Sequence, residues 1–159
     1  MHNNYYFLKI LTKELASRII GLSLSEAFSQ NKNELILSFS KDNRSFYIKA
    51  NLQADFSCLY FPKEFHRAKK NSINLFPELI GNIVIDIIQY ENERCFSIQF
   101  EDNKMLLFKM HGNRANIIAF ENASIIAIFK NSLKQDFDIK QNSLQRKIDH
   151  GYYAFVAND

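Results

Sequence analysis

The feature that most constrains this chain is a succession of short apolar runs between Lys104 and Lys130. The runs Met105–Met110, Ile117–Phe120 and Ser124–Phe129 are rich in β-branched or aromatic residues and are separated by polar residues. Short runs of this composition between Asn- and Gly-containing turns are typical of β-strands rather than helices. The stretch therefore predicts an antiparallel meander whose connections lie at the sheet ends.

The same pattern extends over most of the chain, with further strands expected at 22–28, 35–39, 46–52, 56–61, 83–90 and 94–100. Alternate residues are apolar in the earlier strands, which predicts antiparallel pairing with one solvated face. Leu22, Leu24 and Phe28 are expected to share a face in this way. Several later strands are apolar at both parities, so we expect them to be covered on both faces.

Two helices are expected beside the strands. Residues 12–20 form an amphipathic pattern that Thr12 can cap and Gly21 can end, and residues 74–80 predict a short helix before Gly81. These elements predict an α+β fold, mainly β, built as a two-sheet antiparallel sandwich or barrel with short helices at its edges.

The chain of 159 residues is long enough for one domain with its own core. We assign residues 1–134 to this domain. Residues 135–159 are assigned to a polar tail or the start of a linker, because the hydrophobic period is lost after Asn131. A helical turn at 144–148 is the one element considered within the tail.

Net charge and cysteine content limit the partners and the cellular location that we expect. A net charge of +3 and a pI near 8.8 permit a nucleic-acid partner without requiring one. Cys58 and Cys95 have no Cys or His at metal-ligand spacing, and we interpret them as reduced core thiols. No run has the length of a membrane span or the flanks of a signal peptide, so a cytoplasmic location is expected.

Catalytic chemistry finds little support in the sequence. The four histidines are dispersed, with no cysteine or carboxylate at metal-ligand spacing. There is no glycine-rich phosphate loop and no serine in a nucleophile elbow. We therefore expect no catalytic site, no cofactor, no metal and no small-molecule substrate.

The densest polar feature is the connection between Met110 and Asn116. Arg114 supplies a planar donor fork for phosphate or carboxylate, and Gly112 lets backbone amides approach a ligand. Asn113 and Asn116 complete this polar connection, which we call the corner. An ordinary hairpin turn accounts for the same residues, because Asn and Gly satisfy local turn geometry without a ligand.

Arg94, beside Glu93, begins the strand expected at 94–100. It shares parity with Phe96 and Ile98, which predicts that it points toward the apolar face at the rim of the strand. A guanidinium in that position needs a partner, and Glu93 does not automatically supply one because it points to the opposite face. A phosphate ligand and a snorkelling arginine in a surface ion pair remain equally consistent with the pattern.

A third candidate is the basic loop that contains Lys63, Arg67, Lys69 and Lys70. Its cations are suited to contact a nucleic-acid backbone. A solvated surface loop would have the same composition.

The order of these features resembles the N-terminal domain of the NFACT family, the fibronectin-binding-protein-A-like, RqcH/NEMF-type factors of ribosome-associated quality control. The resemblance covers about Leu11 to Lys134. It rests on Leu11-Thr12-Lys13-Glu14-Leu15, Ile19-Ile20-Gly21, Asn33-Glu34-Leu35-Ile36-Leu37 and, above all, Gly112-Asn113-Arg114-Ala115-Asn116-Ile117-Ile118 followed by Ile125-Ile126 and Lys130. The family usually shows Gly-Arg-His-Ser-Asn before the Ile pair, so Gly112 and Asn116 match whereas the residues between them depart.

The resemblance implies a domain that contacts tRNA and the large ribosomal subunit within a larger factor that extends stalled nascent chains. The family's Asp-Arg pair, implicated in tRNA contact, falls on Glu93-Arg94 here. The family's helix-hairpin-helix, coiled-coil and C-terminal RNA-binding parts have no counterpart in this sequence. The family domain is also similar to the N-terminal domain of formamidopyrimidine-DNA glycosylases, but their Pro-Glu nucleophile is absent from Met1-His2-Asn3.

We therefore expect a non-enzymatic module that binds structured RNA by shape and phosphate contact. The expected RNA-binding residues are Glu93, Arg94, Asn113, Arg114, Asn116, Lys63, Arg67, Lys69 and Lys70. The alternatives are a protein-binding or adhesion role of the fibronectin-binding kind and a scaffolding domain without nucleic-acid contact. A glycosylase-like base-excision activity is a further alternative that we expect to be absent.

Overall fold

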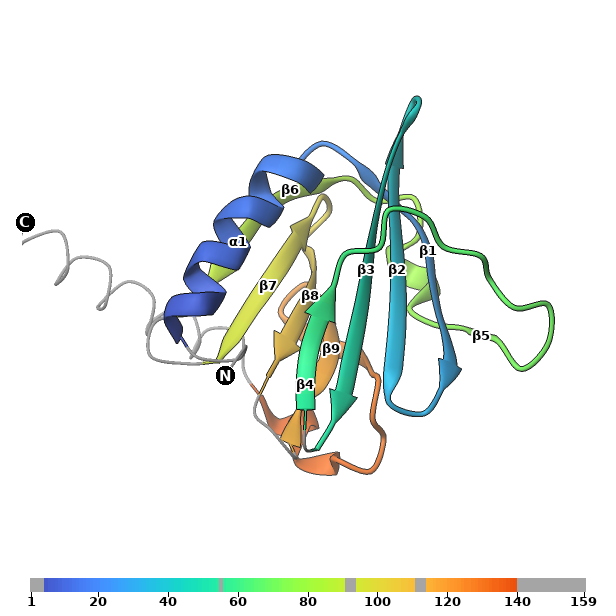
Figure 1. Cartoon of the computed structure of the whole chain (residues 1–159). Coiled ribbons are helices and arrows are strands. Elements are labelled where there is room, and N and C mark those ends of the chain that lie inside the picture. The colour runs from blue at the N-terminus through green and yellow to red at the C-terminus, as the bar shows by residue number, and fades with distance from the viewer. Residues whose placement is uncertain (1–4, 55, 91–93, 111–113, 140–159) are drawn as a thin grey trace, which may run out of the picture.

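The computed structural model describes residues 5–54, 56–90, 94–110 and 114–139. Two five-stranded antiparallel sheets lie face to face, and an α-helix covers the open side between them (Figure 1). This is the mainly β, two-sheet α+β architecture that the sequence predicts. The expected helical turn at 144–148 lies outside the described residues.

Sheet A contains β1 (Ser23–Asn31), β2 (Glu34–Lys41), β3 (Arg44–Gln53), β4 (Phe56–Tyr60) and β5 (Ile73–Asn74); sheet B contains β6 (Val84–Gln89), β7 (Cys95–Phe100), β8 (Lys104–Lys109), β9 (Asn116–Glu121) and β10 (Ser124–Ile128). The strand order is β4-β3-β2-β1-β5 in sheet A and β10-β9-β8-β7-β6 in sheet B. Apart from the short β5, every strand was expected from the sequence, with bounds that differ by a few residues.

The helix α1 (Tyr5–Ile19) begins earlier than predicted. Thr12 was expected to cap it, but this residue lies inside the helix, where its hydroxyl donates to a backbone carbonyl one turn earlier. The helix extends back because Leu8 joins Leu15 and Ile19 in one buried stripe, and that stripe packs into the main core. No helix in the described ranges is both long and apolar enough to cross a lipid bilayer.

Both predicted glycine stops are confirmed, since Gly21 has a φ of +94° and Gly81 a φ of +89°, in the left-handed region that suits glycine. The helix expected at 74–80 is reduced to a 3-10 turn, η1 (Pro77–Leu79). The residues before it instead pair as β5 with β1. A further 3-10 helix, η3 (Lys134–Asp138), falls in a region for which the sequence predicts no element.

The main core lies between the sheets and follows the predicted alternation in β2 and β3. Its members from these strands are Leu35, Leu37, Phe39, Ile48, Ala50 and Leu52, all fully buried. Sheet B has a second buried cluster on its other face, which includes Met105, Leu107, Ile118 and Phe120. The expectation that the later strands are covered on both faces is therefore confirmed for β8 and β9.

Strand β1 departs from the predicted parity. The pairing of β1 with β2 shifts register between Leu24 and Glu26, which is a β-bulge. Ala27 consequently joins the core, whereas Phe28 turns to the outer face of sheet A. There its ring lies 5.8 Å from that of Phe65, so the loop after β4 crosses and covers this part of the sheet.

Candidate nucleic-acid interface

The two candidate arginines lie at the same end of sheet B. Arg94 directly precedes β7, and its carbonyl accepts a hydrogen bond from the Met110 N–H just after β8 (2.8 Å). Arg114 precedes β9, whose first residue, Asn116, is paired with Lys109 at the end of β8. The arginines therefore flank the end of β8 from its two neighbouring strands, which lie about 4.8 Å away on either side.

Both arginines are exposed, and no carboxylate of the described residues forms an ion pair with either guanidinium. Strand β7 begins only at Cys95, so Arg94 lies just outside the paired part of the strand, at its rim. Glu93, Gly112 and Asn113 lie outside the described residues. The RNA-binding role of the two arginines stays a prediction, but their placement at one end is a structural fact.

Asn116 is fully buried and holds this end of the sheet together. Its side-chain oxygen accepts hydrogen bonds from the backbone N–H groups of Lys130 (2.7 Å) and Ile117 (2.9 Å). Its amide nitrogen donates to Asp136 Oδ2 (2.9 Å) and to the Lys130 carbonyl (3.2 Å). Asn116 thus shapes the corner, as expected, but its hydrogen-bonding atoms are directed into the protein and not toward solvent.

Asp136 also forms a buried ion pair with Lys109 at the end of β8. Asp136 is 2% exposed and Lys109 is 8% exposed, so the pair fastens η3 to the sheet. The sequence assigned Asp136 to a polar tail because its neighbourhood is aperiodic. The available signal was Lys109 itself, since a lysine on a strand that is apolar at both parities requires an acidic partner.

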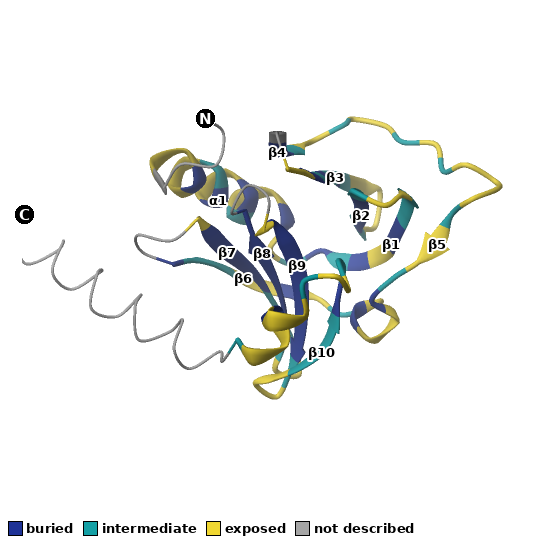
Figure 2. Cartoon of the chain, turned by 90° about the horizontal axis from the view of Figure 1, so that it is seen from below, coloured by how far each residue is buried: buried dark blue, intermediate teal, exposed yellow. Residues whose placement is uncertain are grey.

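Two further cations lie at the same end, one from each sheet. Lys32 is exposed in the turn between β1 and β2. Lys130, just after β10, reaches across from sheet B and donates to the Leu52 carbonyl on β3 (2.5 Å). The β1–β2 turn of sheet A and the start of β7 lie in the lower half of Figure 1, whereas the β2–β3 turn is at the top; Figure 2 shows the chain from below.

The Lys130 ammonium is partly withdrawn from water, and this burial lowers its pKa below the ordinary value of 10.5. Within the part of the chain that the structure describes, no carboxylate pairs with it. Its charge is therefore balanced by a carbonyl dipole and not by an acid.

The predicted basic loop approaches this end through Ala68, whose N–H donates to the side chain of Gln30 at the end of β1 (2.7 Å). Arg67 anchors the loop: its guanidinium lies 4.3 Å from the centre of the Phe28 ring, and its Nε donates to Ser72 (2.6 Å). Lys69 and Lys70 are exposed and follow directly.

A pocket of about 580 Å³ opens at this end between the two sheets, and we call it the inter-sheet pocket. Lysine, serine and asparagine residues line it together with apolar residues. The lining consists of Ser29, Lys32, Asn33, Ala54, Ile73, Leu75, Phe129, Lys130, Asn131 and Ser132. This set contains no carboxylate, so the local field favours an anion.

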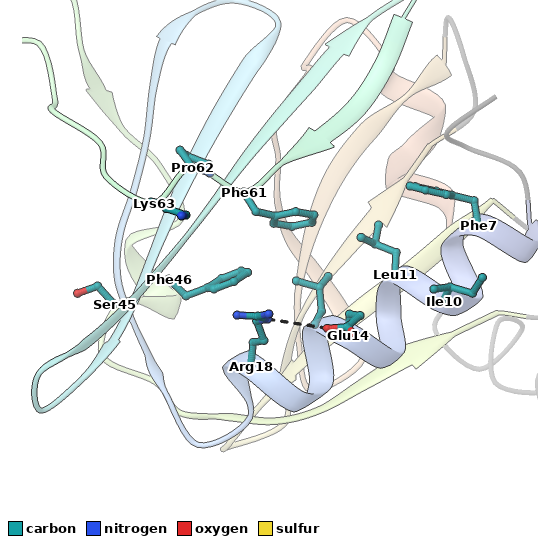
Figure 3. Close-up of a pocket in the computed structure, with 11 residues that line it drawn as sticks. Phe7, Ile10, Leu11, Glu14, Arg18, Ser45, Phe46, Phe61, Pro62 and Lys63 are labelled. Atoms are coloured by element: carbon teal, nitrogen blue, oxygen red, sulfur yellow. Dashed lines mark ion pairs between the residues drawn. The ribbon is translucent and has the colours of Figure 1, made fainter.

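A second depression, of about 550 Å³, runs between α1 and the strands β3 and β4 (Figure 3). We call it the helix groove. Its walls are mostly apolar, with Ile10 and Leu11 of the helix facing Phe46 and Phe61. The Glu14–Arg18 ion pair (3.9 Å) lies at its rim, and Lys63 of the predicted basic loop lines this groove, not the inter-sheet pocket.

Neither depression has the composition of a metal centre. Among the described residues, no three His, Cys, Asp or Glu side chains lie close enough to hold a metal ion. Cys58 and Cys95 are buried in different sheets.

Three solved structures share this fold. The N-terminal domain of fibronectin-binding protein PavA from Streptococcus pneumoniae superposes with a TM-score of 0.69 at 17% identity, over 79% of this chain and 52% of that one. The fibrinogen-binding protein from Staphylococcus aureus gives a TM-score of 0.68 at 17% identity, over 82% and 51% of the two chains.

The N-terminal part of the fibronectin/fibrinogen-binding protein from Streptococcus suis gives a TM-score of 0.69 at 18% identity, over 79% of this chain and 52% of that one. No protein-family model and no curated protein matches the sequence. The chain spans about half the length of each of these structures. It therefore shares its fold with about half of each of these fibronectin- or fibrinogen-binding protein structures.

Proposed function

We propose that this chain is a non-catalytic RNA-binding module that contacts tRNA and the large ribosomal subunit, as part of a cytoplasmic factor of ribosome-associated quality control. The RNA lies against the end of the sandwich where Arg94 and Arg114 flank β8. Lys32 and Lys130 extend the basic surface across the inter-sheet pocket. Lys69 and Lys70 extend it along the basic loop after β4.

One observation carries this proposal. Cations that are far apart in the sequence gather at one end of the fold, and the two arginines there have no acidic partner among the described residues. Exposed guanidinium groups on a rigid sheet end are suited to bidentate phosphate contact. Structured RNA is recognised mostly through its backbone, because its major groove is too deep and narrow for side chains.

The proposal predicts that Arg94→Ala lowers tRNA affinity by about three- to tenfold and reduces the slope of log K against log salt by about one, with little loss of stability. Arg114→Ala is expected to act similarly. The measurement is fluorescence anisotropy of labelled tRNA titrated with the full chain over a range of salt concentrations.

The matched control is Arg44→Ala. Arg44 is also exposed, but it lies beside the β2–β3 turn at the opposite end of sheet A. Its replacement therefore lowers the net charge by the same amount as Arg94→Ala without touching the proposed surface. If the Arg94→Ala/Arg114→Ala double variant binds tRNA as the Arg44→Ala variant does at matched salt, the proposed surface is wrong.

A second candidate function is the binding of a protein ligand of the fibronectin or fibrinogen kind, and the helix groove favours it. Ile10 in this groove is 68% exposed and Phe7 is 40% exposed, which is unusual for large apolar side chains that line a depression. Binding of immobilised fibronectin that is insensitive to salt and is lost in Ile10→Asp supports this function. Binding to tRNA that is unchanged in Ile10→Asp would separate it from the first.

A further inference from the structure

The inter-sheet pocket contains a cation that the fold holds in place. Its central cation, Lys130, is held at two points: its N–H by Asn116 Oδ1 (2.7 Å) and its Nζ by the Leu52 carbonyl (2.5 Å). Leu52 is in turn fixed, because its N–H donates to the Asn33 carbonyl (2.7 Å). The ammonium therefore occupies a set position between the sheets.

The charge in the pocket is unbalanced. Lys130 and Lys32 both line it, and no carboxylate does. An ammonium has three donors, and the Leu52 carbonyl accepts one hydrogen bond from Lys130. An anion in the pocket would take the others and would offset the desolvation of a half-buried cation.

The pocket also has an apolar side, which a bare inorganic anion would leave unused. Leu75 and Phe129 are half-buried here, and Ile73 is 67% exposed at the rim. Asn131 and Ser132, which follow directly after Lys130, also line the pocket. A volume of about 580 Å³ is within the range of small-molecule sites and far exceeds one phosphate group.

From this combination we infer that the inter-sheet pocket binds a single nucleotide, with its phosphate on Lys130 and Lys32 and its base against Ile73, Leu75 and Phe129. The nucleotide is either free or the terminal or unstacked unit of an RNA strand. In the second case the inference deepens the proposed RNA-binding function and rests on it. Lys69, Lys70 and Arg114, exposed at the same end of the fold, offer further phosphate contacts to such a strand.

The test is isothermal titration calorimetry of the full chain with AMP, UMP, adenosine and inorganic phosphate. We expect a saturable site at which each monophosphate binds at least about tenfold more tightly than adenosine or phosphate alone, because only the nucleotide uses both sides of the pocket. Ile73→Ala is expected to lower this advantage over phosphate. No saturable binding of either monophosphate, or equal affinity for AMP and inorganic phosphate, would overturn the inference.

Lys130→Met is expected to weaken AMP binding by about tenfold, which corresponds to one charge-assisted hydrogen bond. The matched control is Lys41→Met, which removes an exposed lysine at the other end of sheet A. Because Lys130 also ties the two sheets together, its variant is checked by circular dichroism. If it does not fold, Lys32→Met in the exposed turn takes its place, and AMP binding that is unaffected by Lys32→Met then contradicts the site.

A tRNA titration of the same variants separates the two proposals. If the chain binds tRNA through Arg94 but binds no monophosphate, the pocket inference fails and the proposed function stands. If monophosphates bind in a Lys130-dependent way but tRNA does not bind, the pocket holds a free nucleotide and the RNA-binding function fails.

Discussion

Sheets A and B have the same number of strands and a similar order, but they are buried to very different degrees. The outer face of sheet A carries Tyr47, Lys49 and Asn51, which are half-buried and polar. On sheet B the side chains that point away from the main core include Leu107 and Phe120, which are at most 1% exposed. Figure 2 shows the contrast, with β7, β8 and β9 buried along their length.

This difference shows how each sheet can contribute to a binding surface. A strand that is buried on both faces rarely unfolds locally, so the residues at its ends are held in place by the whole sheet. The arginines at the end of β8 are therefore expected to be positioned by sheet B. Sheet A, by contrast, reaches the same surface through turns and through the loop after β4, which is held by side-chain contacts at Phe65, Arg67 and Ala68.

The largest predicted effect tests the buried ion pair of sheet B. Asp136→Ala leaves the Lys109 ammonium buried without a counter-charge, and we expect it to lower the free energy of unfolding by about 3–5 kcal/mol. Its matched control on sheet A is Glu34→Ala, which removes the more exposed Glu34–Lys49 pair (3.3 Å) and is expected to cost less than about 1 kcal/mol. Chemical denaturation of both variants measures the difference.

A double replacement sharpens this prediction. Lys109→Met combined with Asp136→Leu removes both charges together, so most of the lost stability is expected to return. If Asp136→Ala costs no more than Glu34→Ala, the two sheets do not differ in the way their burial indicates.

The features of the fold that depend on local periodicity were predicted correctly from the sequence. The apolar residues at both parities of β8 and β9 predicted two covered faces, and the alternation of apolar residues in the earlier strands predicted antiparallel pairing. Features that depend on tertiary contact were not predicted. The bulge that turns Phe28 outward follows from a register choice between β1 and β2, and a single strand's alternation does not encode such a choice.

The residues of the candidate site also fall into those that the local sequence indicated and those that depend on tertiary contacts. Arg94 and Arg114 were selected for their chemistry, and the register of β7, β8 and β9 explains why they lie at one end. The anchoring residue Asp136 was missed because its role depends on Lys109, 27 residues earlier in the chain. Lys130 was noted only as a match to a family pattern, since its contact with Leu52 spans 78 residues.

A smaller effect is expected where the loop after β4 covers sheet A. Arg67→Ala removes the contact with the Phe28 ring and the hydrogen bond to Ser72, and we expect it to lower stability by about 1–2 kcal/mol. Because the loop itself contains lysines, trypsin is expected to cleave it after Lys69 or Lys70 faster in this variant. Lys69→Ala, an exposed control, is expected to change stability by less than about 0.5 kcal/mol. Equal cleavage rates in Arg67→Ala and the unmodified chain would mean that Arg67 does not anchor the loop.

The smallest predicted effect concerns the covered outer face of sheet B at alkaline pH. Tyr90 is 1% exposed there, and its hydroxyl shares a hydrogen bond with Ser97 (3.0 Å). Burial raises the pKa of Tyr90 above its ordinary value of 10.0, and the hydrogen bond to Ser97 opposes this only in part. Below pH 10 the folded and unfolded chains both keep this proton, so Tyr90 makes no contribution to the pH dependence of stability.

Above pH 10 the unfolded chain releases the Tyr90 proton while the folded chain retains it, so stability falls as the pH rises. Tyr90→Phe removes the part of this alkaline loss of stability that comes from Tyr90. At neutral pH the variant is expected to lose about 1 kcal/mol with the hydrogen bond to Ser97, and the difference from the unmodified chain is expected to shrink as the pH rises above 10. Urea denaturation at neutral pH and at two alkaline values measures this, with Tyr6→Phe, whose ring is 76% exposed, as the control. A difference that stays constant with pH would mean that water reaches Tyr90 and that this face of sheet B is not sealed.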